Sequence, residues 1–276
     1  MRSQFGLHID PPLARIPAML EARGLTHFQT TLRDPMRLAK LGIPDDADQH
    51  AYLTRSMEAG GLWGIVHASL ITNLASPDPR LRNGSASTLA ADANLAYALG
   101  LAGVCFHVGY EKGHPSREAA LEAVAYKLKD VLSRLVPGAR VLLENGCEGT
   151  ELGQTIEEIG SVVKAVGADA SRLGVVLDTC HLHVAGFDLA APDAPERLAG
   201  EITEAGLGQF LTALHLNDAR EPCGSHRDRH AAPGTGTIGA GLPRLLAHPM
   251  FQTVPCILEL GVAAAEEGIA YLISQR

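Results

Sequence analysis

The chain has 276 residues, of which 46% are hydrophobic and 20% charged, so it can bury one large core, and we expect a single domain over residues 1–276. No run of about 18 apolar residues indicates a membrane helix, and the first ten residues become polar before an apolar signal segment can form, which predicts a cytoplasmic protein with no membrane partner. The formal net charge of −8 argues against a surface that attracts nucleic acid over its whole extent, without excluding a local basic face.

Short apolar runs alternate with Ala- and Leu-rich segments of helical period along the chain, which is typical of repeated βα units around a parallel sheet. Helices are expected over Ala86–Leu99, Arg117–Leu135 and Thr155–Val166, with Gly100 and Gly167 among the residues that end them. The strands that these patterns predict are Phe5–Ile9, Thr26–Thr30, Leu62–Val66, Gly103–Phe106, Arg140–Leu143, Leu173–Leu177, Leu211–Leu216 and Val254–Leu258.

Eight such units predict an α/β protein of the (β/α)8 TIM barrel class. Its longest irregular segments are Thr31–Gln49 and Ala219–Gly241. In a barrel, long loops that follow strands usually carry the functional residues. We therefore expect function at the C-terminal ends of the strands.

Five cysteines are spread along the chain without a C-x-x-C pair. An odd number at wide spacing argues against a disulfide framework and against a zinc site built from cysteines. We expect reduced thiols at Cys105, Cys147, Cys180, Cys223 and Cys256.

Metal-ligand side chains stand at the ends of six predicted strands. A barrel brings the C-terminal ends of all its strands to one mouth, so residues far apart in the sequence would converge there. A histidine or carboxylate at a single strand end is as often a hydrogen-bonded structural residue, but six together point to a metal site. The six residues are His67, His107, Glu144, Asp178, His215 and Glu259.

Three further candidates lie close by, namely His181, Asp228 and His230. Nine nitrogen and oxygen donors exceed what one tetrahedral zinc ion uses, so the site is expected to hold several ions. Four crowded carboxylates would also repel each other unless cations lay between them.

Seven segments, in order over nearly the whole chain, resemble the endonuclease IV family of apurinic/apyrimidinic endonucleases, a branch of the xylose isomerase-like TIM barrel superfamily. The most specific motifs are D-T-C-H followed by A-G-x-D, and D-R-H followed by a Gly-rich run that ends in I-G. The segments are HASLITNLASP (67–77), FHVG (106–109), LLEN (142–145), VVLDTCHLHVAGFD (175–188), HLND (215–218), DRHAAPGTGTIG (228–239) and ILEL (257–260).

The resemblance implies a site with about three Zn²⁺ ions, with Mn²⁺ as a possible occupant of one or more positions. Glu144 would bridge two ions, and Asp178 and Glu259 would join it as catalytic residues. His67 and His107 would complete one of these ions and Asp178, His215 and Glu259 the other, while the third ion would be held by His181, Asp228 and His230.

The implied reaction is cleavage of duplex DNA 5′ to an abasic site, in base excision repair, by attack of a metal-activated hydroxide on phosphorus. No organic cofactor and no obligate protein partner are expected, and the resemblance implies a monomer. Two other readings stay open. A sugar isomerase or epimerase of the same superfamily would use one or two ions at these strand ends but would not need a third ligand set, and a paralogue could act on another phosphodiester. A barrel that has lost catalysis and only binds a ligand is disfavoured by the complete ligand set.

The loops expected to contact DNA depart from the family pattern. Leu70 stands where the family commonly has Tyr, the segment Asp34–Leu38 lacks the usual Trp and shifts the register of Arg37, and Glu148 lies near a usual Gln. We expect Arg37, Leu70 and Arg229 to contact DNA, with lesion contacts that differ from those of the family. The other basic residues of these loops are Arg33, Arg80, Arg82, Lys112, Arg220 and Arg227.

Several polar residues near the predicted ligands are given supporting roles. His8 is expected to lie behind the ligands, and His183 and Cys180 are expected to pack. Three asparagines are expected to orient ligands or phosphate oxygens, or to make structural hydrogen bonds, and these are Asn73, Asn145 and Asn217.

Overall fold

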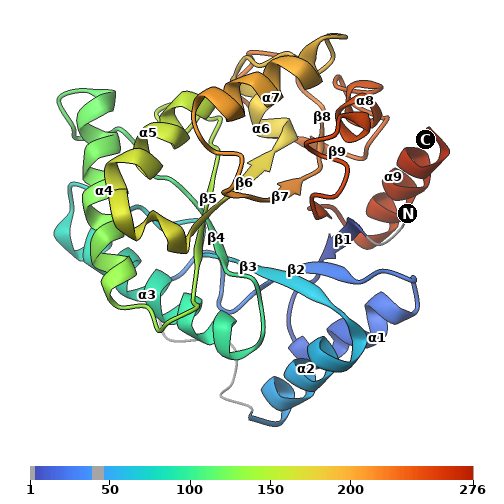
Figure 1. Ribbon diagram of the computed structural model, residues 1–276, viewed down its shortest axis with the longest axis horizontal. Helices are drawn as coiled ribbons and strands as arrows, with labels where there is room; N and C mark the ends of the chain where they lie inside the picture. The colour runs from blue at the N-terminus through green and yellow to red at the C-terminus, as the bar shows by residue number, and fades with distance from the viewer. Residues whose placement is uncertain (1–3, 39–46, 276) are drawn as a thin grey trace.

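The computed structural model describes residues 4–38 and 47–275. The expected domain limits Met1 and Arg276, and residues 39–46 of the long loop Thr31–Gln49, lie outside this description. In the described part, parallel strands close into a barrel in the order β1-β10-β7-β6-β5-β4-β3-β2 (Figure 1). The strands are β1 (Phe5–His8), β2 (His27–Thr31), β3 (Trp63–His67), β4 (Val104–His107), β5 (Val141–Glu144), β6 (Leu173–Asp178), β7 (Leu211–His215) and β10 (Cys256–Leu258).

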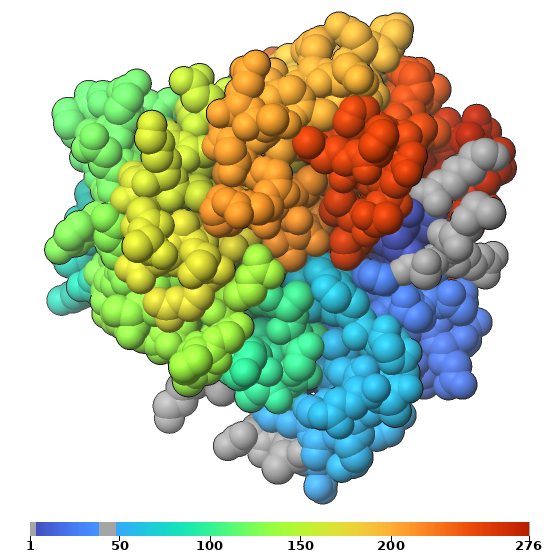
Figure 2. Space-filling model, viewed as in Figure 1, coloured from blue at the N-terminus to red at the C-terminus, as the bar shows by residue number. Residues whose placement is uncertain are grey.

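Helices surround this barrel, and in the same view side chains fill the gaps between their ribbons (Figures 1 and 2). The short strands β8 (Asp218–Ala219) and β9 (His230–Ala231) pair antiparallel after β7. None of the described helices is both long enough and apolar enough to cross a membrane. The helices are α1 (Ile16–Glu21), α2 (Ala47–Gly60), α3 (Pro79–Ala98), α4 (Arg117–Ser133), α5 (Ile156–Val166), α6 (Thr179–Ala185), α7 (Ala194–Glu204), α8 (Gly241–Ala247) and α9 (Val262–Ser274), with 3₁₀ turns η2 (Leu13–Arg15) and η3 (Gly167–Arg172).

The predicted barrel is confirmed, because each of the eight expected strands overlaps a barrel strand within two residues at either end. The expected helix stops are confirmed: Gly100, two residues after the end of α3, has φ 80°, and Gly167, directly after α5, has φ 76°. A positive φ of this kind favours glycine and ends a helix.

Helix α3 begins earlier than the apolar pattern predicts, at Pro79 rather than Ala86. Its first two turns are polar and contain Gly84, so they lack the apolar spacing that indicates a helix. The Asp78 side chain nevertheless caps this end by accepting a hydrogen bond from the Arg80 backbone N–H at 2.8 Å. A proline at the first helical position is favourable there, because it has no N–H to leave unpaired.

Inside the barrel, five apolar side chains from neighbouring strands form a small cluster separate from the core that lies between strands and helices. Successive side chains of a strand point to opposite faces, so the residue two positions further on points inward again. The inner cluster consists of Ile65, Cys105, Leu142, Val176 and Ala213. Two positions further along the same strands stand His67, His107, Glu144, Asp178 and His215.

The Gly-rich run after β9 is organised by one buried carboxylate, that of Asp218. Oδ2 of Asp218 accepts hydrogen bonds from the backbone N–H groups of Gly234 and Gly236, both at 3.0 Å, and Oδ1 accepts one from Ile238 at 3.0 Å. A side chain at position 236 would collide with Asp218 and with the carbonyl of Ala219, which explains the glycine. The H-L-N-D motif and the Gly-rich motif are therefore parts of one hydrogen-bonded unit.

Replacing this carboxylate should destabilise the protein, because several backbone N–H groups, that of the buried Ile238 among them, would lose their acceptor. We expect Asp218→Ala to lower the free energy of unfolding by about 3 kcal/mol or more, and Asp218→Asn to have a smaller effect since one acceptor oxygen is kept. Urea denaturation followed by circular dichroism measures both. The exposed Asp169 provides the control, and an Asp218→Ala variant no less stable than Asp169→Ala would contradict the assignment.

Candidate metal centre

Glu144 lies fully buried at the mouth of the barrel, with histidines on both of its carboxylate oxygens. Oε2 lies 3.1 Å from Nε2 of His67 and 3.7 Å from Nε2 of His107. Oε1 lies 2.7 Å from Nδ1 of His215 and 3.8 Å from Nδ1 of His181. A carboxylate whose two oxygens face different sets of donors has the arrangement needed to bridge two cations.

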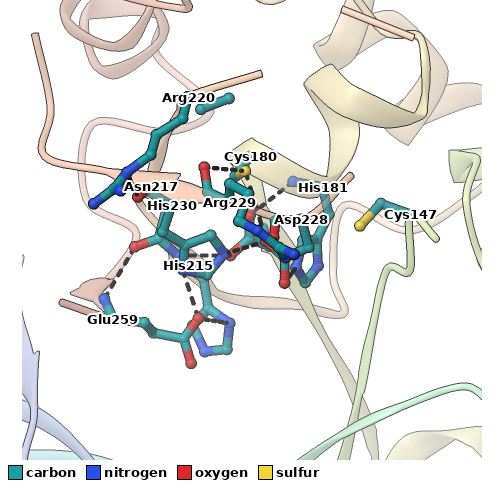
Figure 3. A network of polar contacts seen from close by, with 12 residues as sticks. Cys147, Cys180, His181, His215, Asn217, Arg220, Asp228, Arg229, His230 and Glu259 are labelled. Carbon is teal, nitrogen blue, oxygen red and sulfur yellow. Dashed lines mark hydrogen bonds and ion pairs between the residues drawn. The ribbon is translucent and has the colours of Figure 1, made fainter. Parts of the chain in front are cut away.

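A second group forms around Asp228, which lies between two histidines (Figure 3). Its Oδ2 is 3.2 Å from Nε2 of His181, and its Oδ1 is 3.0 Å from Nε2 of His230. Asp178, at the end of β6, lies 3.6 Å from the same nitrogen of His230. His181 lies on helix α6, Asp228 lies just before β9 and His230 begins β9, so two separate segments of the chain meet at this group.

Glu259 completes the mouth after β10. Its Oε2 lies 3.3 Å from Nδ1 of His215. The Asn217 amide donates hydrogen bonds to Asp178 Oδ2 at 2.6 Å and to Glu259 Oε2 at 3.2 Å, and its oxygen accepts from the Glu259 backbone N–H at 3.0 Å. Asn217 thus orients both carboxylates, which is one of the two roles expected for it. The structure brings all nine predicted ligand side chains together in one mouth.

Four of the histidines direct one ring nitrogen to an acceptor outside the group. An N–H that donates to such an acceptor leaves the lone pair on the other nitrogen, and here that nitrogen faces the mouth. This is the tautomer that a metal ion requires. The contacts are His67 Nδ1 to the Ala68 carbonyl at 2.8 Å, His107 Nδ1 to Glu151 at 2.6 Å, His181 Nδ1 to the Asn145 carbonyl at 2.9 Å, and His215 Nε2 to Gln29 Oε1 at 2.7 Å.

Two buried nitrogens in the mouth fit metal coordination better than hydrogen bonding. Nε2 of His181 and Nε2 of His230 are buried and lie at ion-pair distance from Asp228, 3.2 and 3.0 Å away, but neither makes a well-aligned hydrogen bond to a described residue. Buried polar atoms without a hydrogen bond are uncommon because they lose their contacts with water. The donor atoms of His67, His107 and Glu144 lie within 4.8 Å of one another, as do those of a set formed by Asp178, His181 and His230. These residues fit divalent ions that prefer nitrogen and oxygen ligands.

The charges of the mouth shift the ionisation of its members strongly. Burial lowers the pKa of His215, but Glu144 and Glu259 outweigh burial and raise this pKa to about 9. The pKa of His230 likewise rises to about 9 against the effect of burial, through Asp178 and Asp228. Without metal, protons on the histidines therefore supply the positive charge that the carboxylates require.

Two residues that support the ligands were missed by the sequence reasoning. Gln29 on β2 contacts His215 through its oxygen, and its amide nitrogen lies 2.5 Å from Glu259 and 3.0 Å from His8. The sequence feature that could have indicated Gln29 is a polar residue at an inward-facing position of a buried strand. Glu151 lies in the loop after β5, where Arg117 of α4 donates a hydrogen bond to the Glu151 carbonyl at 2.7 Å. Because Glu151 is not on a strand, the alternation of strand residues could not indicate its position. His8 contacts Gln29 and so supports the ligands indirectly.

The remaining polar residues divide between support of the centre and local structure. Asn145 pairs with the backbone N–H and carbonyl of Asp178, at 2.6 and 3.2 Å, and so fixes the end of β6. Asn73 accepts from the Ala75 N–H at 3.0 Å and holds its own turn. Cys180 is buried with its sulfur 3.8 Å from Asp228, so it packs beside the centre.

A cavity of about 450 Å³ opens above the centre. Leu70 lines it with 48% of its surface exposed, whereas Arg37 and Arg229 are exposed residues that are absent from the described lining. Arg33 is buried and forms an ion pair with Asp92, so it is not a free surface charge for phosphate. Arg15, which follows β1, lines the cavity instead, although the sequence reasoning had not singled it out.

Metal binding by this mouth should weaken as the pH falls. Protons and metal ions compete for the same nitrogens, and a pKa of about 9 for His215 and His230 in the metal-free protein means that protons already occupy them below that pH. The apparent affinity for Zn²⁺ should therefore decrease steadily from pH 9 to pH 6. Competition with a chromophoric chelator measures it, and an affinity independent of pH would contradict these proton positions.

Glu151 should strengthen metal binding through His107. Its Oε1 accepts from His107 while its Oε2 accepts from the backbone N–H groups of Cys147 and Glu148, at 2.9 and 3.2 Å. An amide would place an NH₂ against one of these donors. We expect Glu151→Gln to reduce metal affinity by about 10- to 100-fold with the fold retained. The exposed Glu157→Gln on α5 is the matched control, and equal affinities in the two variants would refute the role.

Comparison with known proteins identifies the family of this chain. The family model described as the xylose isomerase-like TIM barrel matches residues 18–275. A probable endonuclease 4 from Solibacter usitatus is 38% identical over 246 residues, which covers 87% of this chain and 83% of that protein. The crystal structure of endonuclease IV from Thermus thermophilus superposes with a TM-score of 0.83 at 27% identity, covering 99% and 98% of the two chains. A D-tagatose 3-epimerase-like protein shares the fold with a TM-score of 0.75 at 18% identity, over 99% and 96%. The chain belongs to the endonuclease IV family of xylose isomerase-like TIM barrels.

Proposed function

We propose that the protein is a divalent-metal-dependent phosphodiesterase that cleaves DNA 5′ to abasic sites. The observation that carries this proposal is the group around Asp228, which lies between His181 and His230. We call these three residues the third donor set; they lie beside the Glu144 group. A centre with this many donors in one mouth suits phosphoryl transfer, where several cations act on one phosphate. The relatives named endonuclease 4 support the same activity.

The residues of the mouth would hold about three divalent ions, zinc first, with Mn²⁺ as an alternative occupant of one or more positions. Ions bound there supply activated water and neutralise the charge of the phosphate and the leaving oxygen. Glu144 would contribute to two positions, because its two oxygens face different histidines, while Asp178 would act beside His230 and Glu259 beside His215. Asn217 and Gln29 would keep these carboxylates and His215 in place.

The cavity supplies the surface for the substrate. Leu70 is held on its rim by a hydrogen bond from its backbone N–H to the Pro35 carbonyl, at 2.8 Å, which joins the loops after β2 and β3. An apolar side chain there can enter the gap left by a missing base. Arg15 can pair with a phosphate next to the lesion, and Arg37 and Arg229 are proposed as contacts outside the cavity. The protein would act as a monomer and without an obligate protein partner.

A sugar isomerase or epimerase is the second candidate, because the fold is shared with an epimerase-like protein. That likeness concerns the barrel alone. An isomerase would have no use for a separate group at His181, Asp228 and His230, which is why phosphodiester cleavage is preferred. A relative that cleaves another phosphodiester is the third candidate, suggested by Leu70 and by the changed segment Asp34–Leu38.

The proposal is tested on a 5′-labelled duplex that carries one synthetic abasic site. Wild-type protein should cut on the 5′ side of the lesion, and Glu144→Gln should lower the rate by at least about 100-fold because a charge shared by two donor groups is lost. Glu157→Gln, exposed on α5, should cleave as the wild type does. Treatment with a chelator should abolish cleavage and addition of Zn²⁺ should restore it.

Metal content measured by mass spectrometry on the same samples separates the remaining outcomes. Protein that holds about three ions yet leaves the duplex intact would overturn the abasic-site assignment, and other phosphodiesters and sugars would then be assayed. Cleavage that survives in both Glu144→Gln and the chelated protein would show that the mouth is not the active centre.

A further inference from the structure

A second group of metal-type donors lies outside the centre, on the far side of α6. It consists of His183 on this helix, Asp188 just after its end, and Cys223 in the segment between β8 and β9. One ligand atom from each lies within 4.8 Å of the other two. Residues two positions apart point to nearly opposite sides of a helix, so His183 faces away from the mouth that His181 enters.

The end of α6 brings Asp188 back to His183. Gly186 adopts a left-handed conformation with φ 119°, and its N–H bonds to the His183 carbonyl at 3.1 Å. After this turn, Oδ1 of Asp188 lies 3.7 Å from Nδ1 of His183. The same nitrogen accepts a long hydrogen bond of 3.3 Å from the Leu189 N–H, and an ion bound at this nitrogen would replace that hydrogen bond.

Backbone hydrogen bonds hold the third donor against the helix. The N–H of Gly224, next to Cys223, bonds to the His183 carbonyl at 3.2 Å, and the N–H of His226 bonds to the Val184 carbonyl at 2.9 Å. The thiol of Cys223 is exposed, so an ion can reach it from solvent. The site is therefore assembled by the fold before any ion arrives, with two segments of the chain contributing donors.

The charges around this group leave Asp188 available to an ion. Its side chain is 49% exposed, and its ion-pair partner among the described residues is His183. The nearby Arg197 is directed elsewhere, since its guanidinium lies 4.7 Å from the centre of the Phe187 ring and 3.7 Å from Asp193. No lysine or arginine of the described residues forms an ion pair with the Asp188 carboxylate.

We propose that His183, Asp188 and Cys223 bind one divalent ion of the zinc type at a site separate from the centre. An imidazole nitrogen, a thiolate and a carboxylate oxygen are a ligand set that zinc accepts, with water in the fourth position. On binding, the Cys223 thiol gives its proton to the solvent and the sulfur bonds to the metal. This site does not depend on the proposed function of the centre.

The ion would fasten α6 to the segment between β8 and β9. Helix α6 carries His181, and the other segment runs on to Asp228 and His230, so the same two segments supply the third donor set of the centre. An ion at His183, Asp188 and Cys223 therefore acts as a structural clamp that keeps this donor set assembled.

Zinc protection of the thiol tests the site. The wild-type protein is treated with iodoacetamide with and without Zn²⁺, and alkylation of Cys223 is followed by peptide mass spectrometry. Bound metal should slow alkylation at least about tenfold. His183→Gln and Asp188→Asn should abolish this protection, while Asp193→Asn, an exposed aspartate on the same surface, should keep it. Circular dichroism verifies that each variant is folded.

Cobalt binding distinguishes this site from the metal centre, because only a site with a thiolate ligand gives a sulfur-to-cobalt charge-transfer band. Wild-type protein titrated with Co²⁺ should develop a thiolate-to-cobalt charge-transfer band, and Cys223→Ser should lose both this band and one bound ion per chain. A band that persists in Cys223→Ser would assign the thiolate to another cysteine and overturn the proposal, as would alkylation rates that do not respond to Zn²⁺.

Discussion

Four carboxylates held in one buried mouth form the constraint on which the rest of the structure depends. Side by side in a medium from which water is largely excluded, they repel each other and resist ionisation. Burial would raise the pKa of Glu144, yet the charges of His215 and His107 hold it well below its usual range, and the pKa of Glu259 falls to about 2 against the same effect of burial, first through His215. The histidines, the asparagine amide and the closed barrel can all be understood as the means of keeping these negative charges together until cations take the place of protons.

The geometry of strands explains why much of this centre could be predicted from the sequence. A residue at the C-terminal end of a barrel strand must face the mouth if the residue two positions before it faces the inner core, and Glu144 after Leu142 illustrates this rule. This rule of alternation does not apply to residues in loops. Glu151 joins the centre through a turn whose path depends on tertiary contacts. Arg33 is grouped by sequence with the other basic loop residues, because the sequence does not reveal that it is buried against Asp92.

The loops that surround the mouth position their residues in a different way from the strands. Where a strand places its ligand through its own periodicity, the loops place theirs by holding each other, as the Leu70 N–H holds the Pro35 carbonyl and the His226 N–H holds the Val184 carbonyl. Substitutions in such loops change the surface offered to a substrate without disturbing the barrel. This separation explains how the donors of the centre can match the family while the segment Asp34–Leu38 departs from it.

The Gly-rich run after β9 has the composition of a phosphate-binding loop, but the protein has already filled it. Successive backbone N–H groups that point inward usually form a concave nest for an external anion. Here the carboxylate of Asp218 occupies that nest, with Gly234, Gly236 and Ile238 as its donors. The run therefore holds an internal anion where a phosphate-binding loop would hold an external one, and it fixes the backbone that follows His230.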